Sequence, residues 1–129
     1  MQRQQAPFRA DIVGSFLRPA ALKKARFDFA ENKITFEQLT EIENICIRDL
    51  VKKEIAAGLH SVTDGEFRRS YWHLDFMWGF EGVEHKATGG GVPFNDELAV
   101  LDDTYLIGKF KAKAHPFVEY FKFLKQFED

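Results

Sequence analysis

The sequence predicts an α/β fold, and three stretches carry the prediction. Residues 9–15, RADIVGS, form a short apolar run that ends at a glycine, which is typical of a buried strand. Residues 36–57 have apolar side chains at helical spacing, and Gly58 follows as a C-terminal cap. Residues 59–63 predict a second short strand. Because a crossover of this length favours parallel pairing, the three stretches predict a βαβ unit.

Local signals place the helices between the two predicted strands. Pro19 suits the first position of a short helix that runs toward Glu31, where Asn32 is a plausible stop. Thr35 and Gln38 have the spacing of a capping box, so the longer helix is predicted to begin directly after Thr35.

The second half of the chain has weaker patterns. Residues 70–85 predict a short amphipathic helix, and the three glycines at 89–91 predict a flexible loop. Residues 99–114 predict a strand pair with a turn at Asp102 and Asp103. Residues 115–127, HPFVEYFKFLKQF, predict a C-terminal amphipathic helix, and the whole chain, 1–129, is predicted to be a single domain.

Composition limits the partners and the compartment. The chain has 129 residues and a net charge of −2, which gives no long-range attraction to nucleic acid or to an anionic membrane. Its single cysteine, Cys46, excludes an internal disulfide, which fits a reducing compartment, so we expect the cytoplasm. Cys46 lies on the apolar stripe of a predicted helix, where a buried, inert thiol is expected. No apolar run has the length of a membrane span.

The two predicted strand ends suggest a binding site. In a parallel sheet the ligand crevice lies at the carboxyl ends of the strands, so Gly14 and Ser15 are expected on the same rim as Glu66. Gly14 allows close approach to the backbone, Ser15 offers an amide N–H and a hydroxyl, and Glu66 offers a carboxylate. This set suits a small zwitterion. The alternative is that Gly-Ser and Asp-Gly are turn residues only.

Three stretches together resemble the cobalamin-independent methionine synthase family: PFRADIVGSFLRPAALKKAR, AAGLHSVTDGEFRRSYWHLDF and IGKFKAKAHPFVEYFKFLK. The resemblance is to the N-terminal part of short, single-barrel members and covers nearly the whole chain. It implies a TIM-type (β/α)8 barrel and transfer of a methyl group from a 5-methyltetrahydrofolate-type donor to homocysteine. It further implies that the amino-acid part of homocysteine is bound at Val13, Gly14, Ser15 and Glu66.

The same resemblance implies what this chain would lack. The family activates homocysteine on zinc held by a histidine, two cysteines and a glutamate from the C-terminal half of the barrel, so no metal or cofactor is predicted here. A TIM barrel takes about 250 residues. The expected fold is therefore an incomplete (β/α)8 barrel: the first two βα units, a hairpin or loop excursion and a C-terminal helix. Two alternatives remain open, a noncatalytic interaction module and a barrel half that forms homo-oligomers.

Three residues after the second predicted strand are candidates for the pocket rim: Arg68, Trp72 and His73. Arg68 is expected either to steer an anionic substrate or to pair with Asp64 or Glu66 and hold the loop. The aromatic residues Trp72, Phe76 and Trp78 are interpreted as core, with a wall for a pterin ring as the alternative.

Overall fold

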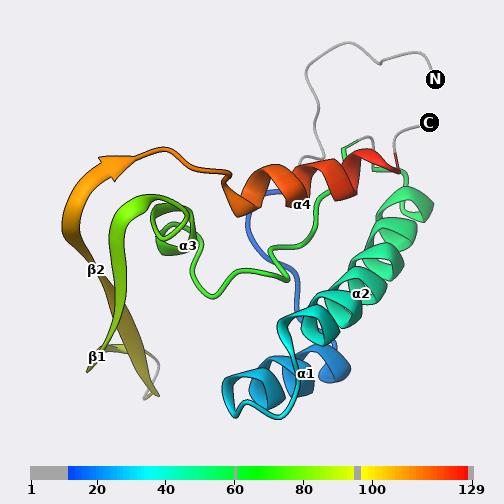
Figure 1. Cartoon of the computed structure of the whole chain (residues 1–129). Helices are drawn as coiled ribbons and strands as arrows, with labels where there is room; N and C mark the ends of the chain where they lie inside the picture. Colours follow the sequence, from blue (N-terminus) through cyan, green and yellow to red (C-terminus); the bar gives the residue numbers. More distant parts are fainter. Residues whose placement is uncertain (1–11, 60, 95–96, 128–129) are drawn as a thin grey trace. The chain divides into compact units, whose positions relative to one another are not determined.

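A computed structural model of the chain describes residues 12–59, 61–94 and 97–127 (Figure 1). These residues form four helices and one two-stranded sheet, in the order α1 (Ala20–Ala30), α2 (Phe36–Ala56), α3 (Leu74–Met77), β1 (Glu81–Phe94), β2 (Glu97–Lys111) and α4 (Pro116–Lys125). The α/β content is as predicted. The described residues divide into two compact units: unit 1 comprises those up to Arg68 and those from Phe123 onward, and unit 2 comprises those from Arg69 to Lys122. The prediction of a single domain stays a prediction.

The predicted helices of unit 1 are confirmed, together with the signals that bound them. α1 follows Pro19, and Asn32 has a φ of 55°, a left-handed conformation in which the helix does not continue. At the start of α2, the Thr35 hydroxyl accepts a hydrogen bond from the backbone N–H of Gln38, and the Gln38 side chain accepts one from that of Thr35. Gly58, with a φ of 81°, follows the end of the helix.

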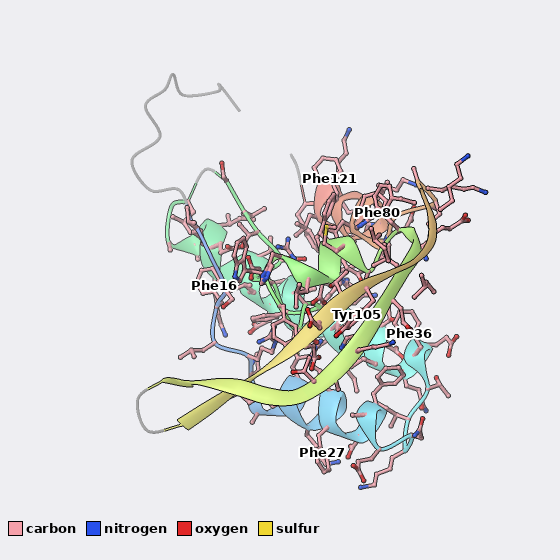
Figure 2. All side chains as sticks on the ribbon, turned by 90° about the vertical axis from the view of Figure 1, so that its left-hand side faces the viewer. Phe16, Phe27, Phe36, Phe80, Tyr105 and Phe121 are labelled. Carbon is pink, nitrogen blue, oxygen red and sulfur yellow. The ribbon has the colours of Figure 1, made fainter. Side chains whose placement is uncertain are left out.

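The core of unit 1 lies between α1, α2 and the segment after residue 63. Leu22, Ile47, Val51 and Phe67 are its largest fully buried side chains. Phe123 of α4 packs on this cluster. Figure 1 shows α1 and α2 side by side, and Figure 2 shows Phe27 pointing outward from α1. The helical spacing of apolar residues read from the sequence therefore marks the buried face of α2.

The two predicted strands of the βαβ unit are not formed in the described residues. Residues 12–15, 59 and 61–63 have no strand structure, while residues 9–11 and 60 lie outside the described part of the chain. A β-ladder requires repeated backbone hydrogen bonds. The two segments instead meet through one described bond between backbones, from Phe16 N–H to the Gly65 carbonyl at 3.1 Å. The predicted parallel pairing is therefore wrong for these residues.

The sheet described in the structure is the antiparallel hairpin β1–β2. The strand structure predicted within residues 99–114 is confirmed in β2, but the predicted loop at 89–91 and turn at Asp102 and Asp103 are not. The glycines at 89–91 lie within β1, not in a loop. Asp102 and Asp103 lie within β2, opposite Ala87 and Lys86, not at a turn. The register shifts after Ala87, and Gly89 has a φ of 62°. The glycines thus allow a β-bulge inside β1. Bulges favour the same residues as turns, so the sequence signal is the same for both.

The remaining helices are close to their predicted positions. α3 is a single turn, shorter than the predicted helix. α4 is as predicted, and the Nδ1 atom of His115 accepts a hydrogen bond from the backbone N–H of Phe117 at its start. Within residues 12–59, 61–94 and 97–127, no helix has both the length and the apolar character that a membrane crossing requires.

Candidate functional site

The residues predicted to bind an amino acid come from two segments that meet in unit 1. The Phe16 N–H bond to the Gly65 carbonyl joins the segment that holds Gly14 and Ser15 to the one that holds Glu66. Val13 is 95% exposed, and Ser15 is also exposed. Gly14 has a φ of 91° with no atom within 4 Å of a Cβ built there, so its surroundings are open. The first segment therefore presents its backbone to solvent.

The second segment is a turn built by its own polar side chains. The hydroxyl of Thr63 accepts a hydrogen bond from Gly65 N–H at 3.1 Å, and the carboxylate of Asp64 accepts one from Glu66 N–H at 2.9 Å. Asp64 is buried. A Cβ at Gly65 would come within 2.5 Å of the Leu50 side chain, so both packing and its φ of 63° favour glycine there.

Glu66 itself has a left-handed backbone with a φ of 57°. This conformation costs a residue other than glycine about 1–2 kcal/mol. Its side chain is partly buried. The carboxylate at position 66 is therefore carried by a backbone conformation that favours glycine.

Glu54 of α2 stabilises the turn through hydrogen bonds to Thr63. Its carboxylate accepts hydrogen bonds from the backbone N–H of Thr63, at 3.2 and 3.3 Å, and from the Thr63 hydroxyl at 3.3 Å. Glu54 is buried, and burial raises the pKa of its carboxyl group, an effect that the bonds from Thr63 partly oppose. The sequence analysis missed Glu54, because on an isolated helix it is one acidic residue among several.

Arg68 was predicted for the pocket rim, but its guanidinium is buried in unit 1. It donates to the Glu43 carboxylate at 2.8 Å and to the side-chain oxygen of Asn44. Its described charged partner is Glu43, a residue of α2 that the sequence analysis did not weigh. The predicted pairing of Arg68 with Asp64 or Glu66 stays a prediction. Burial raises the pKa of Glu43, and the neighbouring charges of Arg68 and Arg26 act against this rise.

The other rim candidates, Trp72 and His73, belong to unit 2. Their rings are in contact in a tilted arrangement, with centroids 4.3 Å apart and 40° between the ring planes, and Trp72 is 73% exposed. The interpretation of the aromatic set as core is wrong for Trp72 and for Phe76, which is 46% exposed. Their role at a pocket rim stays a prediction.

Trp78 belongs to a polar cluster with His85 of β1 and with Asp102 and Thr104 of β2. Its ring stacks on His85 with centroids 3.9 Å apart, and its Nε1–H donates to the Thr104 hydroxyl at 2.9 Å. His85 Nε2 lies 2.7 Å from a carboxylate oxygen of Asp102. This cluster ties α3 and its flanking residues to both strands of unit 2.

The described residues do not fit a zinc site. No three side chains among the histidines, cysteines, aspartates and glutamates of residues 12–59, 61–94 and 97–127 lie close enough together to hold a metal ion. Cys46 is buried, and burial raises the pKa of its thiol, so the predicted inert thiol is confirmed as buried.

Comparison with known proteins shows that this chain is similar to part of longer chains. No family model matches. The chain is 42% identical to two Bacillus subtilis (strain 168) proteins, the uncharacterized proteins YxjG and YxjH, over 96% and 97% of its own length. It spans 33% of the length of each of these curated relatives.

The chain is also similar to solved structures, among them the following two. One is the "Putative Vitamin-B12 Independent Methionine Synthase" from Listeria monocytogenes, with 41% identity and a TM-score of 0.73 over 95% of this chain and 33% of that one. The other is a B12-independent methionine synthase from Shewanella sp. W3-18-1 in complex with selenomethionine, with 25% identity and a TM-score of 0.55 over 73% and 27% of the two chains. These similarities support a relation to methionine synthases that act without vitamin B12.

Proposed function

We propose that this chain carries the amino-acid-binding half of a homocysteine site in a methionine-synthase-like methyltransferase. In this proposal it is the N-terminal portion of a (β/α)8 barrel. Val13, Gly14 and Ser15 supply one side of the site, and Glu66 supplies the other. The 33% share of the relatives' length that the chain covers is consistent with a part of a larger catalytic unit.

The observation that carries the proposal is the left-handed backbone at Glu66, next to the segment that holds Ser15. Strained backbone that the surroundings maintain is concentrated at functional sites. Here the Asp64 carboxylate and the Phe16–Gly65 bond hold the turn in place. A glycine at position 66 would be less strained, so a glutamate there is best explained by a use for its carboxylate.

The chemistry of the two segments suits an α-amino acid. The Glu66 carboxylate is a partner for the ammonium group, and exposed backbone N–H groups near Ser15 are donors for the carboxylate group. The Shewanella protein is in complex with selenomethionine, an amino acid related to methionine, which supports a ligand of this class. Homocysteine shares the same amino-acid part.

Zinc is proposed only for a complete family member. When bound there, it would stabilise the homocysteine thiolate. Because the described residues of this chain do not fit the metal, the part proposed for them is to bind the amino acid and orient it.

Homocysteine titration of the chain, followed by amide chemical shifts, tests the proposal. We expect Glu66→Gln to weaken binding by about 10- to 150-fold, the loss of one hydrogen bond to a charged group, roughly 1.5–3 kcal/mol. Glu41→Gln, which changes an exposed carboxylate of α2, is the matched control and should bind as the wild type does. Equal affinity of the Glu66 variant and the wild type rejects the role of Glu66. Absence of binding by the wild type rejects the site.

A further inference from the structure

We propose that Arg18 is a positioning residue: it fixes the segment that holds Ser15 to the turn that holds Glu66. It thereby sets the position of the Glu66 carboxylate. The inference deepens the proposed function and rests on it for its consequence in binding. Its geometric part stands on contacts within unit 1 alone.

Arg18 reaches two carbonyls of the turn across 48 and 49 residues of sequence. Its Nη2 atom donates to the Glu66 carbonyl at 2.8 Å, and its Nε atom donates to the Phe67 carbonyl at 3.3 Å. With Phe16 N–H on the Gly65 carbonyl, successive carbonyls at 65, 66 and 67 accept bonds from residues 16 and 18. One backbone N–H and one arginine side chain therefore satisfy carbonyls that a β-ladder would otherwise pair.

The bond from Arg18 completes the restraint on Glu66. On one side of its Cα, the Glu66 N–H is held by the Asp64 carboxylate at 2.9 Å. On the other side, the Glu66 carbonyl is held by Arg18 at 2.8 Å. Both peptide groups next to a strained residue are thus fixed, so the direction in which its side chain leaves the backbone is fixed too. Such preorganisation lowers the cost of ordering a site when the ligand binds.

A second arginine shows why Arg18 is distinct. Arg26 of α1 donates to the Phe67 and Arg68 carbonyls at 3.4 and 3.1 Å, and it lies 3.6 Å from the Glu43 carboxylate. These contacts anchor the chain after the turn to the core. Arg18 is the arginine whose described bonds include the carbonyl of Glu66, and it belongs to the segment that holds Ser15. An arginine suits this place because its rigid fork presents two donors to two carbonyls.

Amide hydrogen exchange of the full chain tests, without any ligand, whether Arg18 fixes the segment to the turn. In Arg18→Gln we expect the Phe16 amide to exchange about tenfold faster, the effect of losing roughly one partly buried hydrogen bond, while the Leu50 amide in α2 is unchanged. Arg18→Lys keeps a charged donor group but not the fork that reaches two carbonyls, so it should restore part of the protection. Arg48→Gln, an arginine of α2 that contacts the Phe123 ring, is the matched control and should leave both rates unchanged. Unchanged Phe16 exchange in Arg18→Gln overturns the inference.

Homocysteine titration of the same variants tests the consequence for the site. We expect Arg18→Gln to weaken binding by about tenfold, Arg18→Lys to recover part of that loss, and Arg48→Gln to bind as the wild type does. If Glu66→Gln weakens binding but Arg18→Gln does not, the proposed function stands and the positioning role of Arg18 is overturned. If the wild type binds no homocysteine, the proposed function fails together with this consequence, and the exchange rates alone decide whether Arg18 holds the turn.

Discussion

The two units of this molecule are held together in different ways. Unit 1 contains every hydrophobic side chain that is buried among those the structure describes: Leu22, Ala25, Leu39, Cys46, Ile47, Leu50, Val51 and Phe67. Both units expose large apolar side chains, such as Leu17 and Phe27 in unit 1 and Trp72 and Leu106 in unit 2, but none of the buried hydrophobic side chains that the structure describes lies in unit 2. Figure 2 marks Tyr105 on the hairpin.

The difference extends to the polar contacts. Unit 1 buries charged groups and pairs them over long sequence separations, as in Arg68 with Glu43. Unit 2 relies on ring contacts and on the pairing of two strands. A two-stranded ribbon alone is marginal in water. The candidate site residues at 13–15 and 66 are thus in the unit that has a packed core to hold them.

The largest effect is expected where unit 1 buries its charges. Glu43→Ala removes the partner of a buried guanidinium, so we expect unfolding free energy to fall by about 3–5 kcal/mol. Urea unfolding followed by circular dichroism at 222 nm, which reports mainly on the helices, measures this. Lys53→Ala breaks an exposed pair with Asp49 and should cost about 0.5 kcal/mol or less. Equal effects of the two variants would contradict the contrast between buried and exposed pairs.

A smaller effect is expected in unit 2. Trp78→Phe keeps an aromatic ring for His85 but removes the Nε1–H donor to Thr104, which should lower hairpin stability by about 1 kcal/mol. Amide exchange of Tyr105, which pairs with Glu84 in the hairpin, measures the opening free energy. Trp72→Phe changes a ring that is 73% exposed and serves as the control. A larger loss of hairpin stability in Trp72→Phe than in Trp78→Phe would contradict the stabilising role assigned to Trp78.

The smallest expected effect is a pH dependence of stability that arises from the Glu54 carboxylate. Burial raises the pKa of Glu54 above its ordinary value of 4.5. Between pH 4.5 and the raised folded-state value, the folded chain binds more protons than the unfolded chain, so this group makes stability fall as pH rises. Glu54→Gln removes the titration. The stability of the variant relative to the wild type should therefore increase as pH rises from 4.5 to neutral.

Urea midpoints of both proteins at several pH values in that window test the prediction. Glu43 has a pKa raised in the same direction, but it is present in both proteins, so it cancels in the difference. Parallel curves for the wild type and the Glu54 variant would mean that the Glu54 carboxylate titrates as it does in the unfolded chain.

The sequence by itself determined the elements whose signals are local. The capping box at Thr35, the stop at Asn32 and the apolar spacing of α2 and α4 all act within a few residues, and the structure follows them. The glycines at 89–91 and the aspartates at 102 and 103 misled, because bulges and turns favour the same residues. The choice between them depends on the pairing of β1 with β2.

The sequence also singled out the two segments around Ser15 and Glu66 as candidates, but only the tertiary structure decided what holds them. The contacts of Arg18 with Glu66 and of Arg68 with Glu43 join residues 48 and 25 positions apart. Sequence pattern carries no distance information at such separations, and a lone arginine or glutamate has the same appearance on a solvated face as in a buried pair. Burial in the core of unit 1 is what makes these charges structural, because there they must find a partner.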